Sequence, residues 1–350
     1  MNEINRRNLG LGLLGSVAAS GLLAASSSAA PSATAPADPF ALVDPELLAG
    51  AKALPPLTVS KAILPMMRAR PGMPPKPAPA PQPVMKTIPG PKGAPDVSVM
   101  IIDGTGGQKS CPAYLHMHGG GFVGGRVDGG PGPLQDIAST CGALVVSVDY
   151  RLAPETAFPG ALEDNYAALR WMNLNAASLG IDPKRIAVGG ESAGGGHAAM
   201  LAIAARDRGE FKLAFQLLIY PMLDDRTAST RPAPDHIGHI LWNSGSNRFG
   251  WESLLGMAPG SANPPAGSVP ARVKDLSGLP PTFIGVGALD LFVDEDVEYG
   301  RRLIAAGVPT ELLVVPGAYH GFNGVVPKAT ASVRFNAQAL TALKRGWGLS

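Results

Sequence analysis

The chain has 350 residues, of which 45% are hydrophobic, and its 29 basic and 27 acidic residues give a formal net charge of +2. A chain of this length buries about three quarters of its unfolded surface, so a large core is expected. Because the basic residues form no run beyond isolated pairs, the charge pattern argues against nucleic acid and anionic lipid as partners.

The first 30 residues predict a targeting segment. A mildly apolar stretch follows the adjacent Arg6 and Arg7, and small residues follow that stretch. This order resembles a twin-arginine export signal, with cleavage expected near residues 26–30. A membrane anchor is the alternative, but the stretch is weaker than the roughly 20 apolar residues of a bilayer span. We therefore expect a periplasmic or secreted protein without stable membrane insertion after cleavage.

Two proline-containing segments follow the predicted signal. Residues 38–70 show one or two short helical patterns that end at prolines, and residues 71–95 carry a proline at nearly every second or third position. The first segment predicts short helices, and the second predicts an extended tether rather than a packed element. The folded domain is expected over residues 84–350, with regular alternation from Asp96 onward.

From Asp96 onward, short apolar runs alternate with helical stretches, a pattern that predicts an α/β fold. The predicted strands are 113–118, 143–150, 185–190, 213–220, 282–290 and 311–317. The predicted helices are 161–179, 193–208, 297–306 and 329–345. Such a chain forms a mostly parallel sheet with helices on both faces, and ligands bind at the carboxyl ends of its strands. Residues 222–278 contain no clean strand and predict an inserted helical segment.

The first candidate catalytic residue is Ser192. It stands in "GESAG", residues 190–194, directly after an apolar strand and directly before an apolar helix. G-x-S-x-G in this context is a nucleophile elbow, in which the flanking glycines permit a turn sharp enough to expose the hydroxyl. A glycine-rich helix start without catalytic function is one alternative, and a phosphate-binding loop is less favoured still because no Lys-Ser or Lys-Thr pair follows the glycines.

A serine nucleophile needs a base that is oriented by an acid. Of the six histidines, only His320 follows the late predicted strands. In this fold the acid stands between the serine and the histidine in the chain, and Asp290 closes the strand 282–290. Asp294 is the alternative, but it and the two acidic residues after it are expected in a solvated helix start.

The glycines of "HMHGGGFVGG", residues 116–125, predict an oxyanion hole. A linker does not fit because the run stands between two predicted core strands. The loop after such a strand is where this fold places backbone donors for the oxyanion, and side chains there would obstruct the substrate. We expect the N–H groups of Gly120, Gly121 and Ala193 to converge on it.

Taken together, these motifs resemble the hormone-sensitive-lipase-like bacterial esterases of the α/β-hydrolases. The resemblance covers about residues 40–345 and is carried by "HGGGF", "DYRLAPE", "GESAGG", "YPMLDDR", "DLFVDE" and "HGF". It implies an α/β-hydrolase fold with a helical cap built from the N-terminal helices and a segment near 224–260. It also implies a Ser192, Asp290 and His320 triad with the oxyanion donors named above.

Several polar residues depart from the family pattern or invite another interpretation. Many relatives have Asp in place of Glu191 and an aromatic residue in place of His116, and either change could alter the pocket wall. His197 stands where an apolar residue is usual, which favours a structural histidine on the helix behind the nucleophile. His236 and His239 have no carboxylate or cysteine partner in their spacing, so no metal site is predicted.

The predicted function is a carboxylic ester hydrolase that needs no cofactor and acts on small-molecule esters. The cap implied by the resemblance predicts acyl chains of roughly two to eight carbons and no activation at a lipid interface. One alternative keeps the triad but cleaves an amide, carbamate or lactone. Another is a non-catalytic ligand receptor on the same fold, which would have a damaged triad.

The two cysteines, Cys111 and Cys141, stand at similar offsets before two predicted strand ends. In the strand order implied by the resemblance these strands are neighbours, so a structural disulfide is a possibility in an exported protein. Two reduced thiols are the alternative, because twin-arginine cargo usually folds before export.

Overall fold

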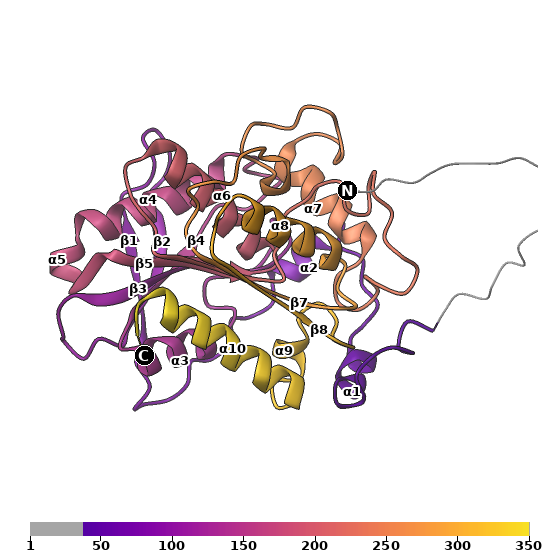
Figure 1. Cartoon of the computed structure of the whole chain (residues 1–350), viewed down its shortest axis with the longest axis horizontal. Coiled ribbons are helices and arrows are strands. Elements are labelled where there is room, and N and C mark those ends of the chain that lie inside the picture. Colours follow the sequence, from indigo (N-terminus) through magenta and orange to yellow (C-terminus); the bar gives the residue numbers. More distant parts are fainter. Residues whose placement is uncertain (1–37, 350) are drawn as a thin grey trace, which may run out of the picture. The chain divides into compact units, whose positions relative to one another are not determined.

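A computed structural model describes residues 38–349, and the predicted export signal lies outside them. Its centre is an eight-stranded sheet in the order β1-β2-β4-β3-β5-β6-β7-β8 (Figure 1). The strands are β1 (Pro83–Ile88), β2 (Val97–Asp103), β3 (Cys111–Met117), β4 (Leu144–Asp149), β5 (Ile181–Glu191), β6 (Phe215–Ile219), β7 (Thr282–Gly287) and β8 (Thr310–Val315). β3 to β8 run parallel, and β2 runs antiparallel to both of its neighbours. The predicted mostly parallel sheet is confirmed.

Helices cover both faces of this sheet, as predicted. α4 (Gly160–Leu174), α6 (Ala193–Arg208) and α8 (Val293–Ala305) lie on one face, and α3 (Pro131–Cys141) and α10 (Thr330–Gly346) lie on the other (Figure 1). The remaining helices are α1 (Pro45–Ala53), α2 (Leu64–Arg68), α5 (Ala176–Leu179), α7 (Ser244–Leu255), α9 (Phe322–Val325) and a 3₁₀ turn, Pro270–Arg272. No helix among the described residues is long and apolar enough to cross a bilayer.

The central strands are apolar on both sides because each face packs against a helical layer. In β3, Leu115 belongs to the core beneath α4 and α6, whereas its neighbour Tyr114 belongs to the core beneath α3 and α10. This alternation follows from the two-residue period of a strand. Because β3 to β8 run parallel, their carboxyl ends lie along one edge, where the loops that carry the predicted site residues begin.

Three elements of the structure, β1, β2 and α3, were not predicted. β1 forms within the proline-rich segment 71–95, where we expected no packed element, and pairs with β2, which we did not predict. β1 contains a single proline, Pro83, which is the first residue of an edge strand, a position where proline is tolerated. α3 was also not predicted, because Pro131, Gly132 and Pro133 conceal its start.

The cysteine disulfide is not present, since Cys111 and Cys141 are both buried free thiols. Cys141 is the last residue of α3 and packs in the core on that helix's side of the sheet. Cys111 begins β3, whose pairing with β5 is irregular between Cys111 and Ala113, and its Sγ lies 4.0 Å from the Lys109 carbonyl oxygen. The similar offsets along the sequence did not reveal that Cys141 belongs to α3.

The N-terminal segment and the insert before β7 contact each other beside the strand ends. The predicted helices are present as α1 and α2 in residues 38–70 and as α7 in the insert. The Val59 N–H donates to Ser246 Oγ at 2.8 Å, and Asn243 Nδ2 donates to the Leu57 carbonyl at 3.0 Å. The start of α7 is therefore tied to the chain that leads into α2.

Candidate active site

Ser192 occupies a strained turn between β5 and α6. Its φ of 57° and ψ of −123° lie in a region that residues with a side chain rarely adopt. The turn is held by its backbone, because the Ser192 N–H donates to the Ile219 carbonyl and its own carbonyl accepts from Gly196 and Met222. The strain directs Oγ away from the sheet while α6 begins at the next residue.

The turn needs glycine on either side of Ser192 because the end of β3 leaves no room there for a side chain. A Cβ on Gly190 would stand 2.1 Å from the Met117 carbonyl oxygen, and one on Gly194 would stand 2.0 Å from the same atom. Real Cβ atoms do not approach this closely. The G-x-S-x-G pattern is therefore explained by packing of the elbow against β3.

The structure brings Ser192, His320 and Asp290 into one hydrogen-bonded chain. His320 Nε2 lies 3.0 Å from Ser192 Oγ, and His320 Nδ1 lies 2.8 Å from Asp290 Oδ2. Asp290 follows β7, is fully buried, and accepts a second hydrogen bond from the Phe292 N–H at 3.0 Å. A carboxylate only accepts, so His320 donates to it through Nδ1 and leaves Nε2 free to take the serine proton.

Aromatic rings enclose the imidazole of His320. Tyr220 and Phe292 meet it edge to face, with ring centroids 4.8 and 5.2 Å away, and Trp242 lies 6.4 Å away. His320 is only 5% exposed, so water has little access to its ring. Trp242 comes from the insert, in the turn before α7.

The acidic residues after Asp290 differ from the expectation of a solvated helix start. Asp294 is exposed in the first turn of α8, as expected, and makes no contact with His320. Glu295 and Asp296 are instead buried, and burial raises the pKa of both carboxyls well above their ordinary values. Glu295 accepts from the N–H groups of Leu223 and Asp224, which ties α8 to the start of the insert.

The predicted oxyanion donors are Gly120, Gly121 and Ala193. Among residues 38–349, no acceptor takes the N–H of any of the three. Gly120 and Gly121 have φ values of 133° and 62°, which turn the loop sharply above β3. A Cβ on Gly119 would lie 3.5 Å from Ser192 Cβ, so this loop passes directly beside the nucleophile.

His118 orders the glycine loop. Its Nδ1 donates to the Gly119 carbonyl at 2.9 Å, and its ring stacks on Tyr150 with centroids 4.3 Å apart. The Tyr150 hydroxyl donates to the His118 carbonyl at 2.6 Å. Burial lowers the pKa of His118 to about 4, so the ring is neutral at pH 7.

The other histidines are not part of the triad. His197 on α6 is 1% exposed, packs edge to face against Phe122 and Tyr150, and has a pKa lowered by burial to about 3. His236 and His239 are exposed. Within the described residues, no three His, Cys, Asp or Glu side chains are grouped in a way that would hold a metal ion.

Sequence reasoning noted His116 and Glu191 separately but missed that they touch. His116 Nε2 lies 3.0 Å from Glu191 Oε2, and His116 Nδ1 lies 2.8 Å from Ser147 Oγ. Burial raises the pKa of Glu191, but the neighbouring His116 more than offsets it, and the pKa lies below its ordinary value. The signal available in the sequence was that both residues depart from the family pattern.

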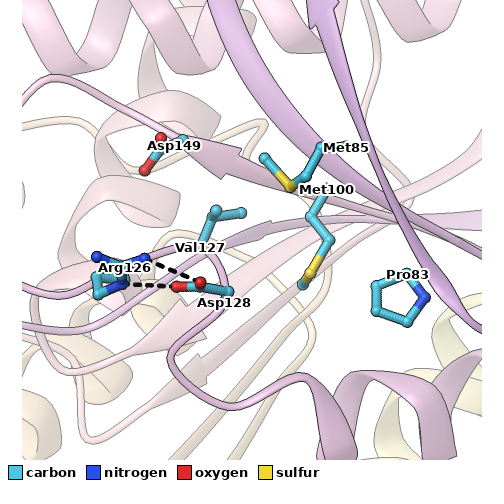
Figure 2. Close-up of a pocket in the computed structure, with 7 residues that line it drawn as sticks. All are labelled: Pro83, Met85, Met100, Arg126, Val127, Asp128 and Asp149. Atoms are coloured by element: carbon cyan, nitrogen blue, oxygen red, sulfur yellow. Dashed lines mark hydrogen bonds and ion pairs between the residues drawn. The ribbon is translucent and has the colours of Figure 1, made fainter. Parts of the chain in front are cut away.

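A separate hollow of about 320 Å³ lies beside β1 and β2 (Figure 2). Its lining consists of Pro83, Met85, Met100, Arg126, Val127, Asp128 and Asp149. Arg126 pairs with Asp128 in its wall. None of these residues belongs to the triad or to the predicted oxyanion hole.

This arrangement supports acyl transfer. The site has the three parts of a nucleophilic triad. They are a serine in a strained turn, a histidine that can take its proton and a buried carboxylate that orients the histidine. The unpaired N–H groups beside Ser192 are donors of the kind that stabilise a tetrahedral oxyanion. The site therefore has the groups needed to attack a carbonyl and to release the acyl group to water.

Known proteins share this fold and its motifs. A family model for the α/β-hydrolase fold matches residues 114–324. The chain is 39% identical over 249 residues to the esterase LipI of Mycobacterium tuberculosis, covering 68% of this chain and 75% of LipI. Carboxylesterase NlhH of the same species is 38% identical over 265 residues, covering 72% of this chain and 79% of NlhH. A solved bacterial heroin esterase superposes with a TM-score of 0.79 and 37% identity, over 88% of this chain and 99% of its own.

Proposed function

The chain belongs to the α/β-hydrolase family and is an ester hydrolase, and we propose that Ser192, His320 and Asp290 catalyse hydrolysis of carboxylic esters with short to medium acyl chains. The observation that carries this proposal is the continuous chain from Ser192 Oγ through His320 to Asp290, with distances of 3.0 and 2.8 Å.

In the first half of the reaction, Ser192 Oγ attacks the ester carbonyl while His320 Nε2 takes its proton. Asp290 holds the imidazole in the tautomer with a proton on Nδ1 and stabilises the imidazolium. His320 then donates its proton to the departing alkoxide, and the alcohol leaves an acyl group on Ser192.

In the second half, His320 takes a proton from water, and the resulting hydroxide attacks the acyl carbonyl. Ser192 recovers its proton as the carboxylic acid is released. In both halves the negative oxygen lies between the loop above β3 and the start of α6. The N–H groups of Gly120, Gly121 and Ala193 stabilise it there without reorganisation.

The helical segments beside the site act in this proposal as a cap over the substrate. Met67 of α2 packs on Gly124 of the glycine loop, and Trp242 packs on Gly121. Trp242 also faces His320, which makes its indole a wall next to the reacting carbonyl. A wall of this size supports a finite acyl pocket, and we propose an optimum at roughly two to eight carbons.

The alternatives differ in what they require of the triad. A ligand receptor on this fold needs no aligned triad, and the intact Ser192, His320 and Asp290 chain favours catalysis. Hydrolysis of an amide, carbamate or lactone uses the same groups, so substrate panels distinguish it from ester hydrolysis.

The test is Ser192→Ala in the purified protein, assayed with p-nitrophenyl esters from acetate to palmitate. We expect kcat to fall by about 10⁴-fold or more with an unchanged melting temperature. Ser178→Ala on α5, an exposed serine, is the matched control and should retain full activity. Near-normal turnover by Ser192→Ala would contradict the assignment of Ser192 as the nucleophile.

We also propose export of the mature enzyme to the periplasm or medium. Support comes from the sequence alone, in Arg6 and Arg7 and the apolar stretch after them. Amino-terminal sequencing of extracytoplasmic protein should show cleavage near residues 26–30. Exclusive recovery of full-length chain from the cytoplasm would contradict it.

A further inference from the structure

The oxyanion hole is built from two separate arms. One arm is the glycine loop after β3, which carries Gly120 and Gly121, and the other is the elbow after β5, which carries Ala193. Donors from both arms must converge on one oxygen atom, so the spacing of the arms determines whether the hole works.

The backbone ladder between β3 and β5 does not extend into these arms. Its last register pair is Met117 with Gly190, and Glu191 pairs instead with Ile219 of β6. Beyond this pair, the β3–β5 ladder no longer joins the two arms, although they remain in contact. Within residues 38–349, the side-chain hydrogen bond that joins β3 to the elbow at this point is the one between His116 and Glu191.

This bond is well placed to fix the spacing. His116 is 5% exposed and is held from behind by Ser147 of β4. Because a carboxylate only accepts, His116 donates through Nε2 to Glu191 Oε2. Glu191 is adjacent to Ser192 in the chain, and a Cβ on Gly119 would stand 2.9 Å from the Glu191 carbonyl oxygen. The acceptor of this hydrogen bond, Glu191, is therefore a residue at which the glycine loop contacts the elbow.

We propose that His116 and Glu191 are positioning residues that hold the two arms of the oxyanion hole at their working separation. The proposal rests on the catalytic roles assigned above to Ser192 and the oxyanion donors. A hydrogen bond to a charged group is one of the stronger interactions available to fix a geometry. Displacement of the reacting groups by about 1 Å can cost 10²-fold in rate, so the tie should act on the transition state.

The test compares variants of Glu191 with p-nitrophenyl acetate as substrate. Glu191→Ala removes the acceptor, and we expect kcat to fall about 10- to 100-fold with KM within threefold of the wild type. Glu191→Gln keeps an acceptor at the same position and should retain kcat within about threefold. The Ki of a trifluoromethyl ketone, which forms a tetrahedral adduct on the serine, should rise with Glu191→Ala in parallel with the loss of kcat/KM.

Two further variants make the test specific. If the two residues act through one bond, His116→Ala combined with Glu191→Ala should lose no more activity than the worse single variant. The matched control is Glu311→Ala, because Glu311 is 36% exposed, similar to Glu191 at 39%, and pairs with Arg345. It lies at the amino end of β8, whereas Glu191 lies at the carboxyl end of β5. The Glu311→Ala variant should leave kcat unchanged.

An unchanged kcat in Glu191→Ala, a loss confined to KM, or additive losses in the double variant would overturn the positioning role. If Glu191→Ala does not fold, His116→Phe removes the same bond while filling the same space and decides the question. Ser192→Ala separates this result from the proposed function. If that variant is inactive while both Glu191→Ala and His116→Phe are normal, only the positioning role is lost.

Discussion

The indole of Trp242 lies against Gly121 so closely that a Cβ on this glycine would stand 2.1 Å from Cη2 of the ring. From α7, Gly250 meets the same loop, since its Cβ would lie 2.6 Å from the Gly121 carbonyl oxygen. The insert therefore packs directly against Gly121, which we propose as an oxyanion donor. This contact couples the shape of the substrate wall to the geometry of the oxyanion hole.

Gly121→Ala tests this coupling. The new methyl group strains a backbone with a φ of 62° and displaces Trp242, so kcat should fall about 10²-fold, as when an oxyanion donor is lost. Gly106→Ala is the control, because its φ is 59° but no atom lies within 4 Å of the new methyl group. Adding Trp242→Ala to Gly121→Ala should recover part of the lost kcat. No recovery would show that backbone strain alone causes the loss.

Arg68 of α2 links this N-terminal helix to the loops after β3 and β4 by hydrogen bonds. Its guanidinium donates to both carboxylate oxygens of Glu155 at 2.8 Å and to the carbonyls of Val123 and Ala153 at 2.8 Å. Arg68→Ala removes all of these bonds, and we expect a loss of roughly 1–3 kcal/mol in unfolding free energy and faster proteolysis before α2. Arg301→Ala, which removes an exposed pair with Glu298, should change stability little.

The Arg68 pair also predicts a pH dependence. The hydrogen bond from Arg68 lowers the pKa of Glu155 from 4.5 to about 2 in the folded state. Stabilisation is therefore complete above pH 4.5 and is lost as pH falls toward 2. Melting curves should show Glu155→Gln below the wild type at pH 7, with a smaller gap at pH 3. A gap that is constant with pH would exclude this ionic contribution.

The triad and the central sheet could be predicted from the sequence because each depends on local signals. Apolar runs mark buried parallel strands, and the glycines around Ser192 mark a turn whose steric reason lies in adjacent strands. The order of Ser192, Asp290 and His320 along the chain follows from the order of the strands that carry them. Asp290 and His320, the proposed catalytic partners, could be named because each stands just after such a strand, and both lie within hydrogen-bonding distance in the structure.

The features that the sequence did not reveal depend on contacts between distant segments. The proximity of Trp242 to Gly121 requires the path of the insert, which no periodicity encodes. The bond between His116 and Glu191 requires the register of β3 and β5. Burial of Glu295 likewise depends on where the chain runs after β6, so a run of acidic residues was interpreted as a solvated helix start.

The buried His197 should lower the stability of the folded protein in acid. Its pKa is lowered from 6.5 to about 3 by burial, and neither ring nitrogen has a partner within the described residues. The unfolded chain therefore binds a proton below pH 6.5 that the folded chain does not, and stability falls as pH drops from 6.5 toward 3. One such group costs about 2 kcal/mol by pH 5.

His197→Leu should remove this acid sensitivity. We expect the variant to be at least as stable as the wild type at pH 7, because an unpaired buried ring is replaced by an apolar side chain. Its advantage should grow between pH 6.5 and 5, as measured by urea unfolding. His236→Asn, at an exposed ring, is the control. A constant difference between His197→Leu and wild type across this range would contradict the assignment.

We expect Trp242 to limit the length of the acyl chain that the site accepts. Its ring packs against Gly121 and lies 6.4 Å from the ring of His320, so we expect an acyl chain attached to Ser192 to meet this wall. Each methylene that can be buried contributes about 0.8 kcal/mol, or about fourfold in kcat/KM, until the pocket is full. Trp242→Ala should therefore move the optimum in a p-nitrophenyl ester series at least two carbons beyond that of the wild type.

The control for this substitution is Trp251→Phe, because Trp251 on α7 is fully buried against Phe122 and has no contact with His320. Trp251→Phe should lower the melting temperature and leave the acyl-length optimum unchanged, since it loosens packing without enlarging the pocket. If Trp242→Ala gives the same result, Trp242 serves only to pack the insert. If the acyl-length optimum of Trp242→Ala shifts while its kcat on acetate falls less than tenfold, the indole of Trp242 limits acyl length and is not needed for the chemical step.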